Sequence, residues 1–260
     1  MLAGKIMTLQ TDHITGPIIL AAGRVAVRLF KSAVSHTEKE RYELVSDADR
    51  RINRLLIEAL RREFPAFGVY SEESEEIEGD GKHRWIIDPL DGTAYFLCGV
   101  PYFSVCLSLE VGGEIIEAFV FNPVSDELYY GSADPTTATL NGKPIRCSSV
   151  DLIGEAKVGV GFSANKPKID KYFADWGDTL SSCQKGIPLI APALSICSVA
   201  RGRLDMFIDN GSSMEGHAGA ALILLAAGGF VRNYDLTEWD HRTTGIVAAN
   251  HALGNVLEKG

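Results

Sequence analysis

The pattern of apolar and polar positions changes near residue 68, where helical periodicity gives way to short strand-like runs. Residues 16–33 carry apolar side chains around most of the helical circumference, which predicts a buried helix. Residues 46–65 contain Ser46 and Asp49 at capping-box spacing, and a stripe formed by Ile52, Leu55, Leu56 and Leu60. We therefore expect a second helix that begins at Ser46 and turns this stripe toward the core.

Strand-like segments follow at residues 67–74, 84–92, 102–113 and 114–132, separated by Gly, Asn-Pro and Ser-Asp turns. Such a run is typical of antiparallel pairing. The Gly112-Gly113 pair predicts a tight hairpin. The acidic stretch beyond Glu73 is predicted to be a solvated loop.

The second half alternates strand-like and helix-like segments, which indicates an α/β lobe. The polar residues around 133–150 mark a boundary between the two patterns. We predict an α+β fold with an N-terminal lobe at residues 1–135, which carries an antiparallel sheet and the metal-site motifs, and a C-terminal α/β lobe at 136–260.

Charge and composition exclude several classes of function. The net charge of −9 does not provide the basic surface that a nucleic-acid polymer requires. No uninterrupted apolar run approaches the length of a membrane span, and the N-terminus lacks the apolar core of a signal peptide. Five scattered cysteines without paired spacing indicate reduced thiols and no zinc site. These features predict a cytoplasmic protein that does not bind a membrane.

Candidate chemistry lies where two strand-like runs end. Glu72 and Glu73 follow the first run, and Asp88 and Asp91 end the second. If the two strands are neighbours, these carboxylates converge, and their repulsion calls for a compensating cation. Oxygen ligands favour Mg²⁺ or Mn²⁺, and Pro89 constrains the loop so that the main-chain carbonyl of Leu90 can point at the same ion.

The residues after Asp91 are suited to an anion. Gly92, Thr93 and Ala94 open a predicted helix, whose free N–H groups and positive dipole end favour a phosphate oxyanion. The Thr93 hydroxyl is also a candidate to hold or deprotonate an attacking water. Taken alone, "DGT" is most often a capped turn and "EES" a solvated loop, but their order and the apolar runs before them favour a site.

Six segments in order resemble the inositol monophosphatase family of Mg²⁺-dependent, lithium-sensitive phosphatases. They are "ELVSDADRRIN", "YSEES", "WIIDPLDGTAYFLCGVPYFSVCLSL", "LNGKPIRCS", "VARGRLDMFID" and "AGAALILLAAGG", and the resemblance covers about residues 14–250. It implies a layered αβαβα phosphatase fold, hydrolysis of a small phosphorylated metabolite and a homodimer.

The resemblance also implies roles for individual residues. Glu72, Asp88, the Leu90 carbonyl and Asp91 match metal ligands. Asp49 and Thr93 match the pair that orients the nucleophilic water, and Glu73 matches a carboxylate behind the ligands. In this scheme one metal lowers the pKa of a bound water and a second stabilises the leaving alkoxide.

One expected metal ligand is missing. Where the family has an aspartate at the start of its last helix, this chain has Gly216. The preceding Glu215 is a candidate replacement, and His217 is a poorer one because imidazole is a weak Mg²⁺ ligand. Two further interpretations remain open: the metal is bound weakly, or Glu215 only satisfies the helix dipole.

Departures also occur where the family recognises its substrate. Ile190 and Ala191 replace an expected Gly-Ser or Gly-Thr pair, and Tyr95 replaces an asparagine. Asp209 keeps a carboxylate that matches a contact to a substrate hydroxyl, although it also suits a strand-end cap. The first hypothesis is therefore a phosphatase. The competing one is a catalytically weakened family member that serves as a binding or regulatory protein because of Gly216.

Overall fold

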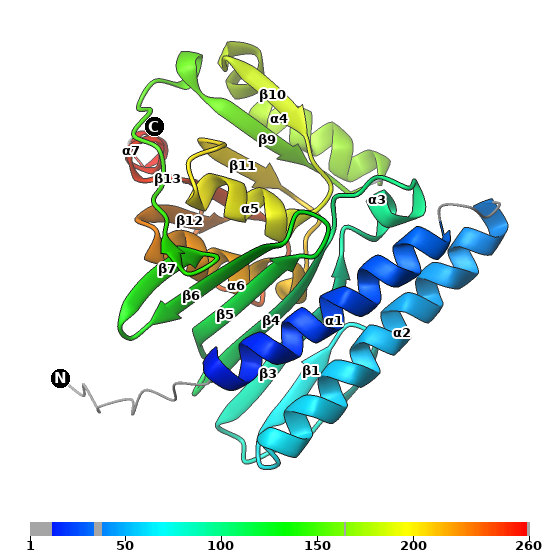
Figure 1. Ribbon diagram of the computed structural model, residues 1–260. Coiled ribbons are helices and arrows are strands. Elements are labelled where there is room, and N and C mark those ends of the chain that lie inside the picture. The colour runs from blue at the N-terminus through cyan, green and yellow to red at the C-terminus, as the bar shows by residue number, and fades with distance from the viewer. Residues whose placement is uncertain (1–11, 34–37, 164, 259–260) are drawn as a thin grey trace.

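Five alternating layers of helices and sheets make up the computed structural model of the chain, which describes residues 12–33, 38–163 and 165–258 (Figure 1). Two helices cover one face of an eight-stranded sheet, two more lie between it and a five-stranded sheet, and two cover the far side. This arrangement confirms the predicted αβαβα architecture of the α+β class.

The first layer is the pair α1 (Asp12–Ala33) and α2 (Glu38–Glu63), which lie side by side in Figure 1. In α1, only one stripe is buried, including Ile19, Ala22 and Ala26. The predicted buried helix is therefore buried along one face only, because a helix on the surface of a sheet needs only one apolar face. Among the described helices, α1 alone is long and apolar enough to cross a membrane, yet its stripe packs in the protein core.

Helix α2 begins at Glu38 and not at the predicted capping box. Ser46 therefore lies inside the helix, because most of the preceding residues 38–45, "EKERYELV", are good helix formers and continue the helix upstream. The predicted core face is confirmed: Ile52, Leu56 and Leu60 are fully buried against the first sheet.

The first sheet has the order β2-β1-β3-β4-β5-β6-β7-β8. Its strands are β1 (Gly68–Ser71), β2 (Ser74–Ile77), β3 (His83–Asp91), β4 (Ser104–Val111), β5 (Glu114–Asn122), β6 (Glu127–Ala133), β7 (Thr136–Leu140) and β8 (Lys143–Pro144). All neighbours are antiparallel, as predicted, except β1 and β3, which are parallel. The predicted hairpin is confirmed, since Gly112 and Gly113 both have positive φ between β4 and β5.

Two parts of this sheet differ from the sequence-based prediction. The acidic segment after Glu73 is not a loop throughout, because Ser74–Ile77 forms the edge strand β2. Strands β7 and β8 extend the first sheet to Pro144, past the boundary placed between residues 135 and 136. The division of the chain into two lobes stays a prediction.

The remaining layers are built around the second sheet, whose order is β10-β9-β11-β13-β12. Its strands are β9 (Lys157–Gly161), β10 (Lys185–Pro188), β11 (Met206–Asp209), β12 (Gly229–Asn233) and β13 (Ile246–Asn250). Helices α5 (Pro192–Ala200) and α6 (Met214–Ala226) lie between the sheets, whereas η1 (Ile153–Glu155), α4 (Lys166–Ser182) and α7 (His251–Leu257) lie on the outer side (Figure 1). A short helix, α3 (Thr93–Leu97), follows β3 directly.

The first sheet is buried on both faces. In β5, Phe119 and Phe121 belong to the core under α1 and α2, whereas Ala118 and Val120 face α5 and α6. A strand that is covered on both faces has a nearly continuous run of apolar residues in its sequence. The small residues on one face allow the middle helices to approach the sheet closely.

Candidate active site

The two strand ends that carry the predicted ligands are adjacent. Strand β1 pairs in parallel with β3, so that Ser71 lies opposite Ile87. Glu72 and Asp88, the next residue on each strand, therefore reach the same edge of the sheet. This confirms the neighbour relation on which the predicted convergence of carboxylates depends.

An irregularity in β3 shapes this edge. Asp88 pairs with Cys106 and Asp91 with Ser104, so one extra residue of β3 bulges out of the ladder. Within the bulge the Leu90 amide donates to Asp88 Oδ1 over 3.0 Å, and the Leu90 carbonyl accepts from Thr93 Oγ1 over 2.9 Å. The Leu90 carbonyl thus points toward Thr93 instead of into the sheet.

Asp91 is a buried carboxylate with several donors. Its Oδ2 accepts from Ser104 Oγ over 2.9 Å, and the amides of Ala193 and Leu194 at the start of α5 also donate to its carboxylate. Burial raises the pKa of Asp91 to about 7, although these hydrogen bonds act in the opposite direction. Asp91 therefore joins β3 to α5. Its hydrogen bonds do not fully offset the cost of burying its negative charge, so its pKa stays raised.

Neighbouring carboxylates raise one another's pKa. Burial, followed by the charges of Glu73 and Glu72, raises the pKa of Asp49 on α2 to about 7. Burial and then the charges of Asp91 and Glu72 raise the pKa of Asp88 well above its usual range. The structure thus brings Asp49, Glu72, Glu73, Asp88 and Asp91 into one acidic site, with Glu72 and Glu73 at its exposed side.

The first turn of α6 faces this acidic site. A Cβ added at Gly216 would lie 3.5 Å from Asp88 Oδ2 and 3.8 Å from Asp91 Oδ1. Glu215 is only 8% exposed, and its Oε2 has no hydrogen-bond partner among the described residues. Its charge is the second cause, after burial, of a raised pKa at Glu72.

The turn after Asp91 requires glycine. Gly92 has φ 88°, and a Cβ there would lie 3.0 Å from the Tyr102 carbonyl oxygen and 3.1 Å from Ala191 Cβ. Helix α3 begins immediately afterward, and the first amides of a helix, here those of Thr93 and Ala94, have no intrahelical acceptor. These donors lie directly beside Asp91.

Asp209, at the end of β11, lies on the Asp91 side of the site. Its charge contributes to the raised pKa of Asp91. Its Oδ1 accepts from the amides of Gly211 and Ser212, and the residue is 5% exposed. This oxygen therefore serves as a cap for the turn that leads into α6.

His217 is poorly placed to bind a cation. It is fully buried, its Nδ1 lies 3.0 Å from Ser212 Oγ, and its Nε2 lies 3.0 Å from the His241 carbonyl oxygen. Burial lowers the pKa of His217 to about 4. Both ring nitrogens already have protein partners, which leaves Glu215 as the better candidate in this turn.

Three polar residues that position the site, Ser71, Asn53 and Ser104, were not predicted from the sequence. Ser71 Oγ donates to Asn53 Oδ1 over 2.8 Å and accepts from the Glu73 amide over 3.3 Å. The contact between Ser71 and Asn53 fixes the loop of Glu72 and Glu73 against α2, one helical turn away from Asp49. The position of Asn53, four residues after Asp49, was a usable signal, whereas Ser104 depended on the register of β3 and β4.

The acidic site suits a hard cation but is not a finished cage. Across residues 12–33, 38–163 and 165–258, no three Asp, Glu, His or Cys side chains are already gathered around one ion position. The chemistry of the donor set still fits Mg²⁺ or Mn²⁺, because all candidate groups offer oxygen. The unpartnered Oε2 of Glu215 and the mutually raised pKa values are the features that a bound cation would relieve.

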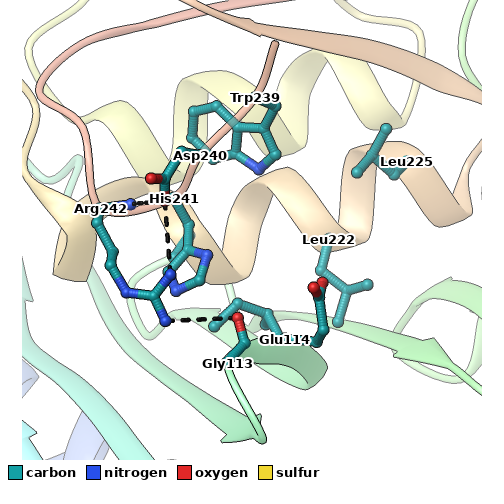
Figure 2. Close-up of a pocket in the computed structure, with 10 residues that line it drawn as sticks. Gly113, Glu114, Leu222, Leu225, Trp239, Asp240, His241 and Arg242 are labelled. Carbon is teal, nitrogen blue, oxygen red and sulfur yellow. Dashed lines mark hydrogen bonds and ion pairs between the residues drawn. The ribbon is translucent and has the colours of Figure 1, made fainter.

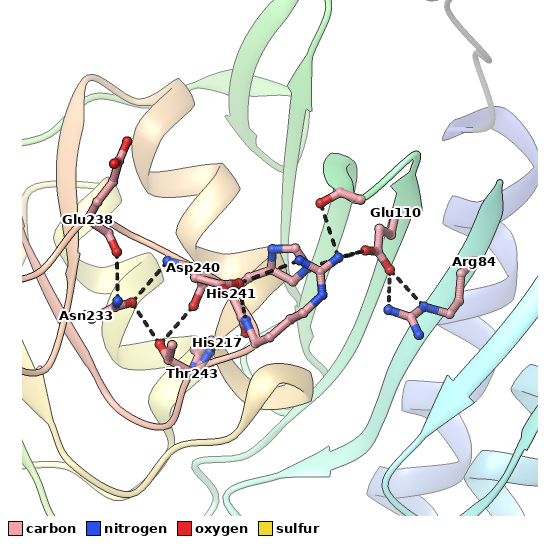
Figure 3. Close-up of polar contacts among 10 residues, drawn as sticks. Arg84, Glu110, His217, Asn233, Glu238, Asp240, His241 and Thr243 are labelled. Carbon is pink, nitrogen blue, oxygen red and sulfur yellow. Dashed lines mark hydrogen bonds and ion pairs between the residues drawn. The ribbon is translucent and has the colours of Figure 1, made fainter. Parts of the chain in front are cut away.

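A cavity lies on another part of the molecule. Figure 2 shows Leu222, Trp239 and Arg242 around a cavity of about 270 Å³ between α6 and the β4–β5 hairpin. None of the predicted site residues lines it. Nearby, Figure 3 shows Glu110 between Arg84 and the turn that carries His241, an ion-pair network that ties the first sheet to residues 240–243.

Comparison with known proteins identifies the family. A sequence profile of the inositol monophosphatase family matches residues 11–259. The chain is 36% identical over 219 residues to an inositol-1-monophosphatase of Rhizobium meliloti, covering 84% of this chain and 82% of that protein. It is 34% identical over 229 residues to the Nus factor SuhB of Pseudomonas aeruginosa, covering 84% of each chain.

Solved structures agree with this assignment. An inositol monophosphatase from Anabaena superimposes with a TM-score of 0.83 at 28% identity, covering 95% of this chain and 93% of that one. Its fold is the same layered arrangement of helices and sheets. On the sequence match over nearly its whole length, this chain belongs to the inositol monophosphatase family.

Proposed function

We propose that this protein hydrolyses a small phosphate monoester by attack of a water molecule, with Mg²⁺ or Mn²⁺ as cofactor. The observation that carries the proposal is the convergence of Asp49, Glu72, Asp88 and Asp91 beside the start of α3, with pKa values that several of them raise in one another. The Leu90 carbonyl and Glu215 complete the set of candidate cation ligands. When bound, the cation supplies an activated water and neutralises charge on the phosphate.

Thr93 and Asp49 are assigned to the attacking water. The Thr93 hydroxyl donates its proton to the Leu90 carbonyl, so its lone pairs can accept a hydrogen bond from water. Asp49, a buried carboxylate beside Glu72 and Glu73, is placed to accept the proton of that water. Glu73 supports Asp49 through its nearby charge.

The phosphate group is assigned to the start of α3. The amides of Gly92, Thr93 and Ala94 are the donors next to the cation ligands, and oriented amides at such a turn favour an oxyanion. The substrate class is an inositol phosphate or a related sugar or nucleotide phosphate. Asp209 Oδ2 is the remaining carboxylate oxygen for a substrate hydroxyl.

We further propose that the enzyme is lithium-sensitive, cytoplasmic and homodimeric. All five cysteines are free thiols, as a reducing compartment requires. Light scattering of the purified chain tests the dimer, and a molecular mass near 28.2 kDa would contradict it.

The central test measures phosphate release from a panel of substrates: inositol 1-phosphate, fructose 1,6-bisphosphate, adenosine 3′,5′-bisphosphate and histidinol phosphate. Activity should require Mg²⁺ or Mn²⁺ and decrease with lithium. Asp91→Asn should abolish turnover while the circular dichroism spectrum stays unchanged. Asp178→Asn on α4, a matched loss of one exposed carboxylate, should leave turnover unaffected. Failure of the folded protein on the whole panel would reject the proposal.

A second candidate function is a binding or regulatory role with weakened catalysis. Gly216 favours it, because the acidic site lacks a side chain at the position that faces Asp88 and Asp91. A relative named as a Nus factor shows that members of this family are not named for hydrolysis alone. A turnover number close to the uncatalysed rate on every ester, with normal cation binding, would favour this second function.

A further inference from the structure

The first turn of α6 presents two adjacent residues to the acidic site in different ways. Gly216 faces Asp88 and Asp91, since a Cβ there would lie within 4 Å of a carboxylate oxygen of each. Because glycine has no side chain, residue 216 offers no ligand to a cation bound between this turn and the Asp88–Asp91 pair.

Glu215 lies on a different side of the same site. The Tyr70 hydroxyl on β1 donates a hydrogen bond to the Glu215 carboxylate, and Glu72, just after β1, lies within range of the Glu215 charge. Successive residues of a helix project about 100° apart, so Glu215 and Gly216 cannot occupy the same position. Glu215 therefore adds a carboxylate on the Glu72 side and does not fill the gap beside Asp91.

The burial of Glu215 points to a ligand. Only 8% of the residue is exposed, and its Oε2 has no hydrogen-bond partner in the described part of the chain. A buried carboxylate oxygen without a partner costs free energy unless a cation or proton compensates it. No basic side chain is paired with Glu215 among the described residues, and the hydrogen bond from the neutral Tyr70 hydroxyl supplies no charge, so a diffusible cation or a proton is left to compensate Oε2.

We propose that Glu215 is a divalent-cation ligand that acts together with Glu72 and Asp88, while Gly216 leaves the Asp88–Asp91 side short of one carboxylate. This inference rests on the proposed function and adds to it an unequal pair of cation positions. The position beside Glu215 binds tightly. The position beside Asp91 binds weakly, because affinity for a hard cation rises with the number of charged ligands.

Equilibrium Mn²⁺ binding tests this without any need for turnover. Free Mn²⁺ is measured by electron paramagnetic resonance during titration of the full chain, and folding is checked by circular dichroism. Glu215→Gln should raise the Kd of the tighter ion about tenfold or more, equivalent to a loss of about 1.4 kcal/mol. Glu215→Asp, which keeps the charge on a shorter side chain, should have a smaller effect.

The gap is tested by adding the missing carboxylate. Gly216→Asp should lower the Kd of the weaker Mn²⁺ ion about tenfold. The matched control is Glu114→Gln, which removes an exposed carboxylate at the opposite end of the first sheet and should change neither constant.

Two results would overturn the inference. One is a folded Glu215→Gln variant with unchanged Mn²⁺ affinity. The other is a folded Gly216→Asp variant with no gain in affinity. If cation binding follows the expected pattern but no phosphate ester is hydrolysed, the proposed function fails and the ligand assignment stands. If hydrolysis is observed while Glu215→Gln leaves Mn²⁺ binding unchanged, the ligand assignment fails and the proposed function stands.

Discussion

Individual side chains in the acidic site have more than one task. Asp91 accepts from Ser104 and from two amides of α5, so it holds two elements together as well as facing the predicted cation. Thr93 similarly joins the Leu90 carbonyl to the start of α3. Substitutions here must therefore separate loss of chemistry from loss of structure.

Thr93 offers such a separation because serine and valine divide its functions. Thr93→Val keeps the shape but removes the hydroxyl, so kcat should decrease by about 10²-fold or more if the hydroxyl orients the water. Thr93→Ser keeps the hydroxyl and should retain most of the activity. Steady-state kinetics on the best substrate compares them, and equal rates for the two variants would contradict the assigned role.

Glu110 permits a prediction of pH-dependent stability. Burial alone would raise its pKa, but hydrogen bonds from Arg84 and the charges of Arg84 and Arg242 outweigh burial and lower it (Figure 3). Because the folded-state pKa lies below the unfolded value, the stabilisation is present above about pH 4.5 and is lost as pH decreases through the folded-state pKa.

Glu110→Gln should therefore reduce the free energy of unfolding by about 2 kcal/mol at pH 7, with a smaller difference near pH 3. Urea denaturation at both pH values measures this. Glu114→Gln, an exposed substitution close by, serves as control and should be neutral. A difference from the wild type that is the same at both pH values would show that packing and not charge is responsible.

At the scale of elements, the start of α5 forms one wall of the site. Ala191 provides no side-chain cap, Pro192 has no N–H group, and the next two amides donate to Asp91. This turn therefore offers few donors to a substrate hydroxyl. Beside it, Ile190 is 43% exposed and its amide lies 3.3 Å from the Tyr95 hydroxyl.

These side chains lead us to expect that the alcohol half of the substrate contacts an apolar wall. Ile190→Ser should then raise KM for phenyl phosphate about fivefold, through the loss of about 1 kcal/mol of apolar contact, without raising KM for inositol 1-phosphate. Steady-state kinetics with both esters checks the ratio. An equal effect on the two substrates would show that Ile190 does not distinguish them.

At the scale of the whole molecule, α6 is the element on which the site depends. It lies between the two sheets (Figure 1). Its first turn faces the acidic site, because a Cβ at Gly216 would lie within 4 Å of Asp88 and Asp91. The close approach of α6 to the first sheet requires a glycine on the helix and a glycine on the sheet. A Cβ at Gly131 of β6 would lie 2.9 Å from Ile223 Cα, and one at Gly219 of α6 would lie 3.2 Å from Ala118 Cβ.

Gly131→Ala should therefore push α6 away from the first sheet. We expect the free energy of unfolding to decrease by about 2 kcal/mol, as for other overpacked core positions, and Mn²⁺ affinity to decrease with it. Gly177→Ala on α4 is the matched control, because a Cβ there meets nothing within 4 Å. Denaturation and Mn²⁺ titration measure the two effects, and unchanged values for Gly131→Ala would contradict this account.

Local signals predicted much of the fold. The Gly112-Gly113 hairpin and the buried stripe of α2 were both predictable, because each depends on a few residues close in sequence. The start of α2 and the strand β2 were not. Helix-forming residues upstream of Ser46 compete with a capping signal, and an acidic edge strand resembles a loop in composition.

Periodicity alone predicted a mixed α+β chain, whereas the layered fold, the family and the candidate residues of the acidic site followed from the short motifs that carry the family resemblance. How residues from distant segments face one another could not be read from either signal, because it depends on the packing of whole elements. Glu215 lies toward Glu72, whereas Gly216 faces Asp88 and Asp91. That difference arises from how α6 is oriented between the sheets, which depends on contacts such as Gly131 against Ile223 and not on any local pattern.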